Sequence, residues 1–172
     1  MRRLFLISLL GTSLAWAGPN DPSKFEATPL GVQRAVYQFN FANPQDLEQG
    51  LGYLNNHLKA LSQFGNVAQS RLVVVMHGNE LHMLSRLNRA TYPDIYDELK
   101  TLVDHGVLFK VCRNAAKFRG YAPEDFYDVV TVVPAAMTEL VKWQAQGYAY
   151  ISGDVIQRTR RVDAPAVAPK SN

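Results

Sequence analysis

Cysteine is almost absent from this sequence, because Cys112 is the only one among 172 residues. A single thiol cannot form a disulfide within the chain, so the stability of the fold must come from its hydrophobic core. The thiol is therefore either a free, reactive group or paired with another molecule.

A strong excess of charge is also missing. The sequence has 18 basic and 15 acidic residues, but Arg2, Arg3 and the tail from Asp154 hold much of the positive charge. The rest of the chain has 12 basic and 13 acidic residues. A domain with so little net charge lacks the excess of basic residues that is typical of a nucleic-acid-binding protein. The basic tail is typical of a solvated extension.

Apolar runs long enough to cross a bilayer are absent, and the one extended run lies at the N-terminus. There, Arg2-Arg3 precedes an apolar stretch from Leu4 to Leu14, and Ala15-Trp16-Ala17 provides a small-residue cleavage pattern. These features predict a signal peptide over residues 1–17, cleaved after Ala17. The short basic start favours Sec export over the twin-arginine route. We therefore expect a periplasmic protein without a membrane span.

The remainder divides into three parts. Residues 18–33 contain three prolines among polar residues and are predicted to form an extended leader. Residues 34–151 form one predicted domain. Residues 152–172 are polar, basic and rich in proline and alanine, which predicts a disordered tail.

Strand and helix patterns alternate through the domain. The segment Arg71–His77 is an almost continuous apolar run, which is typical of a parallel strand buried on both faces. The alternation predicts a three-layer α/β/α fold with a mostly parallel sheet of about five strands. The expected strands are Arg34–Phe39, Arg71–His77, Val107–Val111, Phe126–Val133 and Tyr148–Ile151, and the expected helices are 44–64, Leu81–Leu87, Pro93–His105, Ala115–Arg119 and Ala135–Gln146.

Cys112 and His77 each follow a predicted strand, and ligands of parallel sheets bind beyond the carboxyl ends of the strands. The unpaired N–H groups of the helix after Cys112, together with the neighbouring Arg113, favour a thiolate. Cys112 is then a reactive thiol, or alternatively a small buried apolar residue. His77 is either a proton donor or hydrogen-bond partner of Cys112, or it satisfies backbone groups of its turn.

Asn114 and Arg119 are further candidates for lining the same pocket. The alternative roles are a helix cap for Asn114 and a surface ion pair for Arg119. His77 and His82 are five residues apart, not the four that places two ligands on one helix face, so no metal site is predicted. No glycine-rich phosphate loop follows a strand, so no cofactor is predicted either.

Several motifs resemble a known family. From Cys112 to Gly120 the sequence reads CRNAAKFRG, which resembles the C-x-x-A-A-x-x-R-G stretch of the DsrE/TusD sulfur-relay subunits. The run VVVMHG, ending at Gly78, and the ending V-P-x-x-x-x-E-L…Q-x-x-G-Y-A-Y-I, from Val133 to Ile151, are more similar to the broader DsrE/DsrF-like group. This resemblance covers residues 34–151.

The resemblance implies a three-layer α/β/α fold that assembles into homotrimers or homohexamers. It also implies that Cys112 carries sulfur as a persulfide in a sulfur relay. Arg113, Asn114 and Arg119 are the predicted substrate-binding residues beside it, and the expected donor or acceptor is a protein or a small sulfur compound. We therefore expect a sulfur carrier more than a turnover enzyme. The alternative is a non-catalytic oligomeric scaffold of the same fold, in which Cys112 is only packed.

Overall fold

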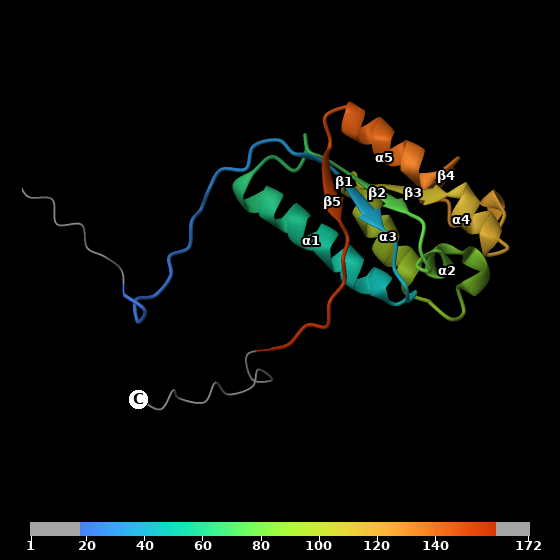
Figure 1. The fold of residues 1–172 in the computed structure, drawn as a ribbon, viewed down its shortest axis with the longest axis horizontal. Helices are drawn as coiled ribbons and strands as arrows, with labels where there is room; N and C mark the ends of the chain where they lie inside the picture. The colour runs from blue at the N-terminus through green and yellow to red at the C-terminus, as the bar shows by residue number, and fades with distance from the viewer. Residues whose placement is uncertain (1–17, 161–172) are drawn as a thin grey trace, which may run out of the picture.

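A five-stranded sheet forms the centre of the protein (Figure 1). The computed structural model describes residues 18–160, so the predicted signal peptide and residues 161–172 lie outside the described residues. The strand order is β4-β3-β2-β1-β5, and all neighbouring pairs are parallel. The strands are β1 (Arg34–Phe39), β2 (Arg71–Met76), β3 (Leu108–Cys112), β4 (Val130–Val133) and β5 (Ala149–Ser152).

Helices cover both faces of the sheet. Figure 1 shows α1 and α3 on one face and α5 on the other, which confirms the predicted three-layer α/β/α fold. Within residues 18–160, no helix is long and apolar enough to cross a membrane. The helices are α1 (Asp46–Phe64), α2 (Leu81–Leu84), α3 (Ile95–Asp104), α4 (Arg113–Phe118) and α5 (Ala136–Ala145), with short 3-10 turns at Arg86–Asn88 and Pro123–Asp125.

The strand β2 lies in the middle of the core. Its residues from Leu72 to Met76 are at most 2% exposed, which confirms the predicted burial on both faces. Successive side chains of a strand alternate between the two faces. On the α1 side they join the larger apolar cluster, together with the leucines of α1. On the α5 side the smaller cluster contains Val36, Val73, Val75, Cys112, Ala136 and Leu140.

Two predicted elements differ from the structure by three or more residues at one end. The helix α2 ends at Leu84 because Ser85 has extended backbone angles (φ −84°, ψ 126°) and pairs with Phe126 in an antiparallel bridge. The strand predicted from Phe126 begins only at Val130. Phe126 and Tyr127 are nevertheless buried in the core, so their apolar character indicated burial but not strand.

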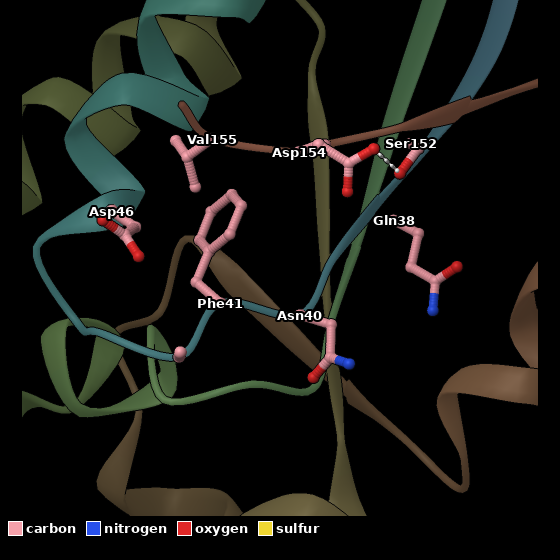
Figure 2. A pocket seen from close by; sticks show the side chains of 9 residues that line it. Gln38, Asn40, Phe41, Asp46, Ser152, Asp154 and Val155 are labelled. Atoms are coloured by element: carbon pink, nitrogen blue, oxygen red, sulfur yellow. Dashed lines mark hydrogen bonds between the residues drawn. The ribbon is translucent and has the colours of Figure 1, made fainter. Parts of the chain in front are cut away.

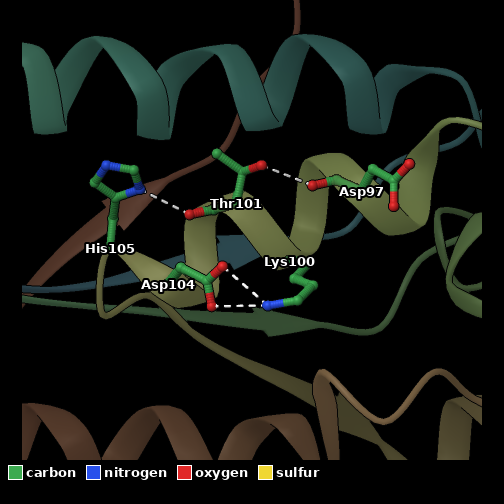
Figure 3. A network of polar contacts seen from close by, with 5 residues as sticks. All are labelled: Asp97, Lys100, Thr101, Asp104 and His105. Carbon is green, nitrogen blue, oxygen red and sulfur yellow. Dashed lines mark hydrogen bonds and ion pairs between the residues drawn. The ribbon is translucent and has the colours of Figure 1, made fainter.

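A polar cluster stabilises the end of α3 (Figure 3). Lys100 and Asp104 form an ion pair at 2.9 Å, and Thr101 Oγ1 donates to the carbonyl of Asp97 at 2.8 Å. His105 Nδ1 donates to the carbonyl of Thr101 at 2.7 Å. These groups are exposed and follow helical spacing, so each contributes little to the stability of the helix.

The side chain of Glu80 ties together the two loops that follow β1 and β2. It is fully buried, and its carboxylate accepts hydrogen bonds from the backbone N–H groups of Phe41 at 2.9 Å and Gly78 at 2.8 Å. Burial raises the pKa of Glu80, and the backbone hydrogen bonds oppose that rise. The carboxylate thus fixes the turn that begins after His77.

Gly78 is required where these loops meet. A Cβ atom built on Gly78 would clash with Glu80 Oε2 and the backbone nitrogen of Phe41, and would lie 2.7 Å from the carbonyl carbon of Asn40. Two of these three neighbours are backbone atoms that no side-chain rotation can move away. The glycine is therefore needed for space.

We predict that Gly78→Ala lowers the free energy of unfolding by about 1–3 kcal/mol, because the added methyl overpacks the loop junction. Gly52→Ala is the matched control, since a Cβ there meets nothing within 4 Å and alanine is the better helix former. It should raise stability by up to about 1 kcal/mol. Urea unfolding of both variants tests this, and equal behaviour would contradict the packing seen at Gly78.

A second prediction concerns the pH dependence of stability through Glu80. Its folded pKa lies above the ordinary glutamate value of 4.5, so the folded state binds the proton more tightly than the unfolded state. This contribution is fully present below pH 4.5 and is lost as pH rises through the folded pKa. The unfolding free energy of the wild type minus that of Glu80→Gln should therefore fall as the pH rises above 4.5 and through the folded pKa. A constant difference would contradict the buried carboxylate.

Candidate functional site

His77 and Cys112 lie beside each other at the carboxyl edge of the sheet. The register pairs Val75 with Lys110 and Met76 with Val111, so the next residues along are His77 and Cys112. The N–H of His77 donates to the carbonyl of Phe39 at 3.1 Å, which continues the ladder one step past β2. Adjacent strands are about 4.8 Å apart, and the structure thus brings the two predicted site residues together.

Cys112 ends β3 and at the same time caps α4. Its Sγ accepts a hydrogen bond from the N–H of Ala115 at 3.5 Å. The residue is 6% exposed and packs with Val73 and Val75 under α5. The thiol is thus free but mostly covered, and a small reactant reaches it more easily than a bulky one.

His77 is half-buried and held by a chain of hydrogen bonds across the sheet. Its Nε2 lies 2.7 Å from Nε2 of Gln38, and Tyr150 donates from its hydroxyl to Oε1 of Gln38 at 2.5 Å. Burial lowers the pKa of His77, and the positive charge of Arg119 lowers it further. Both effects favour a neutral imidazole.

Arg119 connects α4 to the turn after β2. Its Nε and Nη2 donate to Oδ1 of Asn79 at 3.1 and 3.0 Å, and its Nη1 donates to the carbonyl of Ala115 at 3.0 Å. The surface ion pair considered for Arg119 is wrong, because the guanidinium binds amide and carbonyl oxygens. Its charge instead lies close enough to act on His77.

Arg113 and Asn114 are exposed in the first turn of α4. The proposed capping role of Asn114 is wrong, because the N-cap residue is Cys112, whose sulfur takes the cap position. Arg113 lies at the rim of a cleft of about 420 Å³, together with Lys117 and Tyr121. A substrate-binding role for Arg113, Asn114 and Arg119 stays a prediction.

A second cleft, of about 370 Å³, lies where β1 and β5 end (Figure 2). Figure 2 shows Phe41 and Val155 facing each other, with Asp46 on one side and the hydrogen-bonded pair Ser152–Asp154 on the other. Gln38 lines this cleft and also bonds to His77. The amide of Gln38 thus connects this cleft to His77.

Metal-binding groups are not assembled in the part of the chain from residue 18 to 160, where no three His, Cys, Asp or Glu side chains are placed to hold an ion. His82 bonds through Nδ1 to the hydroxyl of Tyr121 at 2.7 Å. It therefore belongs to a different network from His77.

The sequence analysis missed Gln38, Tyr150 and Asn79 as parts of this arrangement. One signal was present: Gln38 is a polar residue near the end of an otherwise apolar strand. Its partner Tyr150 lies 112 positions away, and no sequence spacing links the two.

Comparison with known proteins identifies the family. The model of the DsrE/DsrF-like family matches residues 36–152. A solved structure of a protein of unknown function from Methanobacterium thermoautotrophicum is similar, with a TM-score of 0.57 and 22% identity over 70% of this chain and 98% of that chain. No curated protein matches. The structural likeness shows the fold, and the family model, matching most of the chain, shows that the protein belongs to the DsrE/DsrF-like family.

Proposed function

We propose that this protein is an exported sulfur carrier that holds sulfane sulfur as a persulfide on Cys112. The observation that carries the proposal is the placement of the only thiol beside His77, at the carboxyl edge of a parallel sheet, in a chain of the DsrE/DsrF-like family. Family membership supports a sulfur-relay type of function in general. The placement of Cys112 at the edge of the sheet supports this residue as the one that carries the sulfur.

The transfer step needs no oxidant. Cys112 loses its proton to solvent, and the thiolate attacks the outer sulfur of a donor persulfide, R–S–SH. The S–S bond of the donor breaks as the new S–S bond forms, which leaves Cys112–S–SH. The electron pair departs with R–S⁻, which takes a proton from water. The reverse sequence hands the sulfur to an acceptor thiol.

The surroundings of Cys112 fit an anionic sulfur compound. Arg113 is adjacent in sequence, and Arg119 is anchored to Asn79 and Ala115 within the same region. We propose that Arg113, Asn114 and Arg119 face the donor or acceptor, which is a partner protein or a small sulfur compound. A single thiol without a resolving cysteine suits a carrier that holds its cargo.

Export and assembly belong to the same proposal. The signal-peptide pattern of residues 1–17 supports a periplasmic location. Self-association as a homotrimer or homohexamer follows from the family resemblance. Exposed apolar side chains on α5, Met137 and Val141, support a contact surface there.

A second candidate function is an oligomeric scaffold in which Cys112 is only structural. The small exposed fraction of Cys112, 6%, favours it, together with the apolar packing against Val73 and Val75. The two functions differ in one measurable property, which is uptake of sulfur by the native thiol.

We predict that incubation of the purified chain with inorganic polysulfide adds about 32 Da, the mass of one sulfur atom, and that dithiothreitol removes it. Cys112→Ser should abolish the adduct, because no other thiol exists. Intact-protein mass spectrometry measures both.

Controls separate chemistry from packing. The oligomeric state of Cys112→Ser should match the wild type if the residue is a carrier, so that loss of the adduct reports the missing thiol and not a lost assembly. Compared with the rate of each reagent on the urea-unfolded chain, folding should slow a bulky maleimide more than it slows iodoacetamide, since the opening is small. A native thiol that takes up neither sulfur nor iodoacetamide, combined with a destabilised serine variant, would establish the scaffold instead.

A further inference from the structure

Three side chains from three neighbouring strands form one hydrogen-bonded row on the α5 face of the sheet. Tyr150 of β5 donates to Oε1 of Gln38 of β1 at 2.5 Å, and Nε2 of Gln38 lies 2.7 Å from Nε2 of His77, which follows β2. The hydroxyl end is open to solvent, since Tyr150 is 46% exposed. The row thus runs from the edge of the sheet to the ring beside Cys112.

The direction of these hydrogen bonds fixes the tautomer of His77. Tyr150 donates to the amide oxygen of Gln38, so the NH₂ group of Gln38 faces the imidazole. An NH₂ group has only protons to offer, so Nε2 of His77 must accept. A neutral imidazole has a single ring proton, which then lies on Nδ1.

Nδ1 of His77 is available for other chemistry. Within residues 18–160, the ring of His77 makes its one hydrogen bond through Nε2. Other titratable groups on the same face are Cys112 and Lys110 of β3 and Glu139 of α5, which binds Lys142 and Trp143. Arg119 of α4 and the partial burial of the ring both favour the neutral form of His77.

We propose that Gln38, aligned by Tyr150, is a positioning residue that holds His77 with its single proton on Nδ1, as a hydrogen-bond donor to the sulfur on Cys112. This inference rests on the proposed sulfur-carrier function. The neutral N–H stabilises the anionic persulfide without giving up its proton, since the resulting imidazolate would be far too basic. His77 contacts the sulfur directly, whereas Gln38 and Tyr150 act through His77.

His57 provides an internal contrast in the same protein. Its Nδ1 accepts from the hydroxyl of Tyr37 at 2.7 Å, and its Nε2 donates to Oε1 of Gln33 at 2.7 Å. The ring proton of His57 is therefore on Nε2, the opposite tautomer. Two glutamine–histidine pairs thus hold two rings in opposite states, and Gln33→Leu is a matched control for Gln38→Leu.

Long-range ¹H–¹⁵N NMR of the purified chain reads the tautomer of each of its four histidines, with His77 assigned by His77→Gln. We expect the Nδ1–H form for His77 and the Nε2–H form for His57. Gln38→Leu should release His77 to the Nε2–H form and leave His57 unchanged, whereas Gln33→Leu should affect only His57. Tyr150→Phe, which removes only a hydroxyl, should partly release His77.

Gln38→Glu should favour the charged form of the His77 ring, whereas the wild-type glutamine holds the neutral form. A carboxylate accepts from Nε2–H, so the ring should become cationic more easily and the pKa of His77 should rise by about 1–3 units. Gln38→Leu should slow polysulfide uptake by Cys112 about 2–10-fold, the equivalent of one lost hydrogen bond. Gln33→Leu should leave uptake unchanged.

The outcomes separate this inference from the proposed function. A wild-type chain that takes up no sulfur contradicts the carrier function, whatever the tautomers are. A chain that takes up sulfur but keeps the same His77 tautomer in Gln38→Leu and Gln38→Glu overturns the inference. A changed tautomer with an unchanged uptake rate also overturns it, because Gln38 would then position His77 without consequence for Cys112.

Discussion

The parallel pairing of β2 with β1 and β3 is the constraint on which the whole site depends. Because β2 is buried on both faces, a shift of one residue would turn His77 toward the apolar cluster under α1. In the observed register, His77 instead faces the α5 side, between Cys112 of β3 and Gln38 of β1. Packing of apolar residues thus sets the geometry of polar ones.

The α5 face changes character along the strands, and the site begins where the apolar cover ends. Val36, Val73 and Val75 lie under α5, and the next residues on the same face are Gln38 and His77. Partial burial there strengthens hydrogen bonds and disfavours charge on the imidazole. The same burial leaves Cys112 only 6% exposed, which restricts access to small reactants.

The loops at this edge are held by backbone contacts and one buried carboxylate. Glu80 binds N–H groups from both loops, and Gly78 permits their close approach. Arg119 then links the turn after β2 to α4 through Asn79. The backbone of His77 is therefore fixed by the turn that follows it and by the ladder to Phe39, and its ring is held by Gln38.

The sequence alone determined the three-layer fold and the location of Cys112 and His77, because alternating strand and helix patterns are local and parallel strands end at one edge. The family followed from the motifs around Cys112 and the ending at Ile151. Local patterns also misled at several points. For example, α2 stops at Ser85 through a distant bridge with Phe126, and the sulfur of Cys112 takes the cap expected of Asn114.

Only the tertiary structure decided which polar groups meet. Gln38 and Tyr150 come from strands 112 residues apart that become neighbours because β5 returns to the far side of β1. Burial of Glu80 and the anchoring of Arg119 by Asn79 likewise depend on loops brought together by the sheet. Periodicity in a sequence shows which face a side chain takes, whereas its partner is set by the strand order, which no local pattern contains.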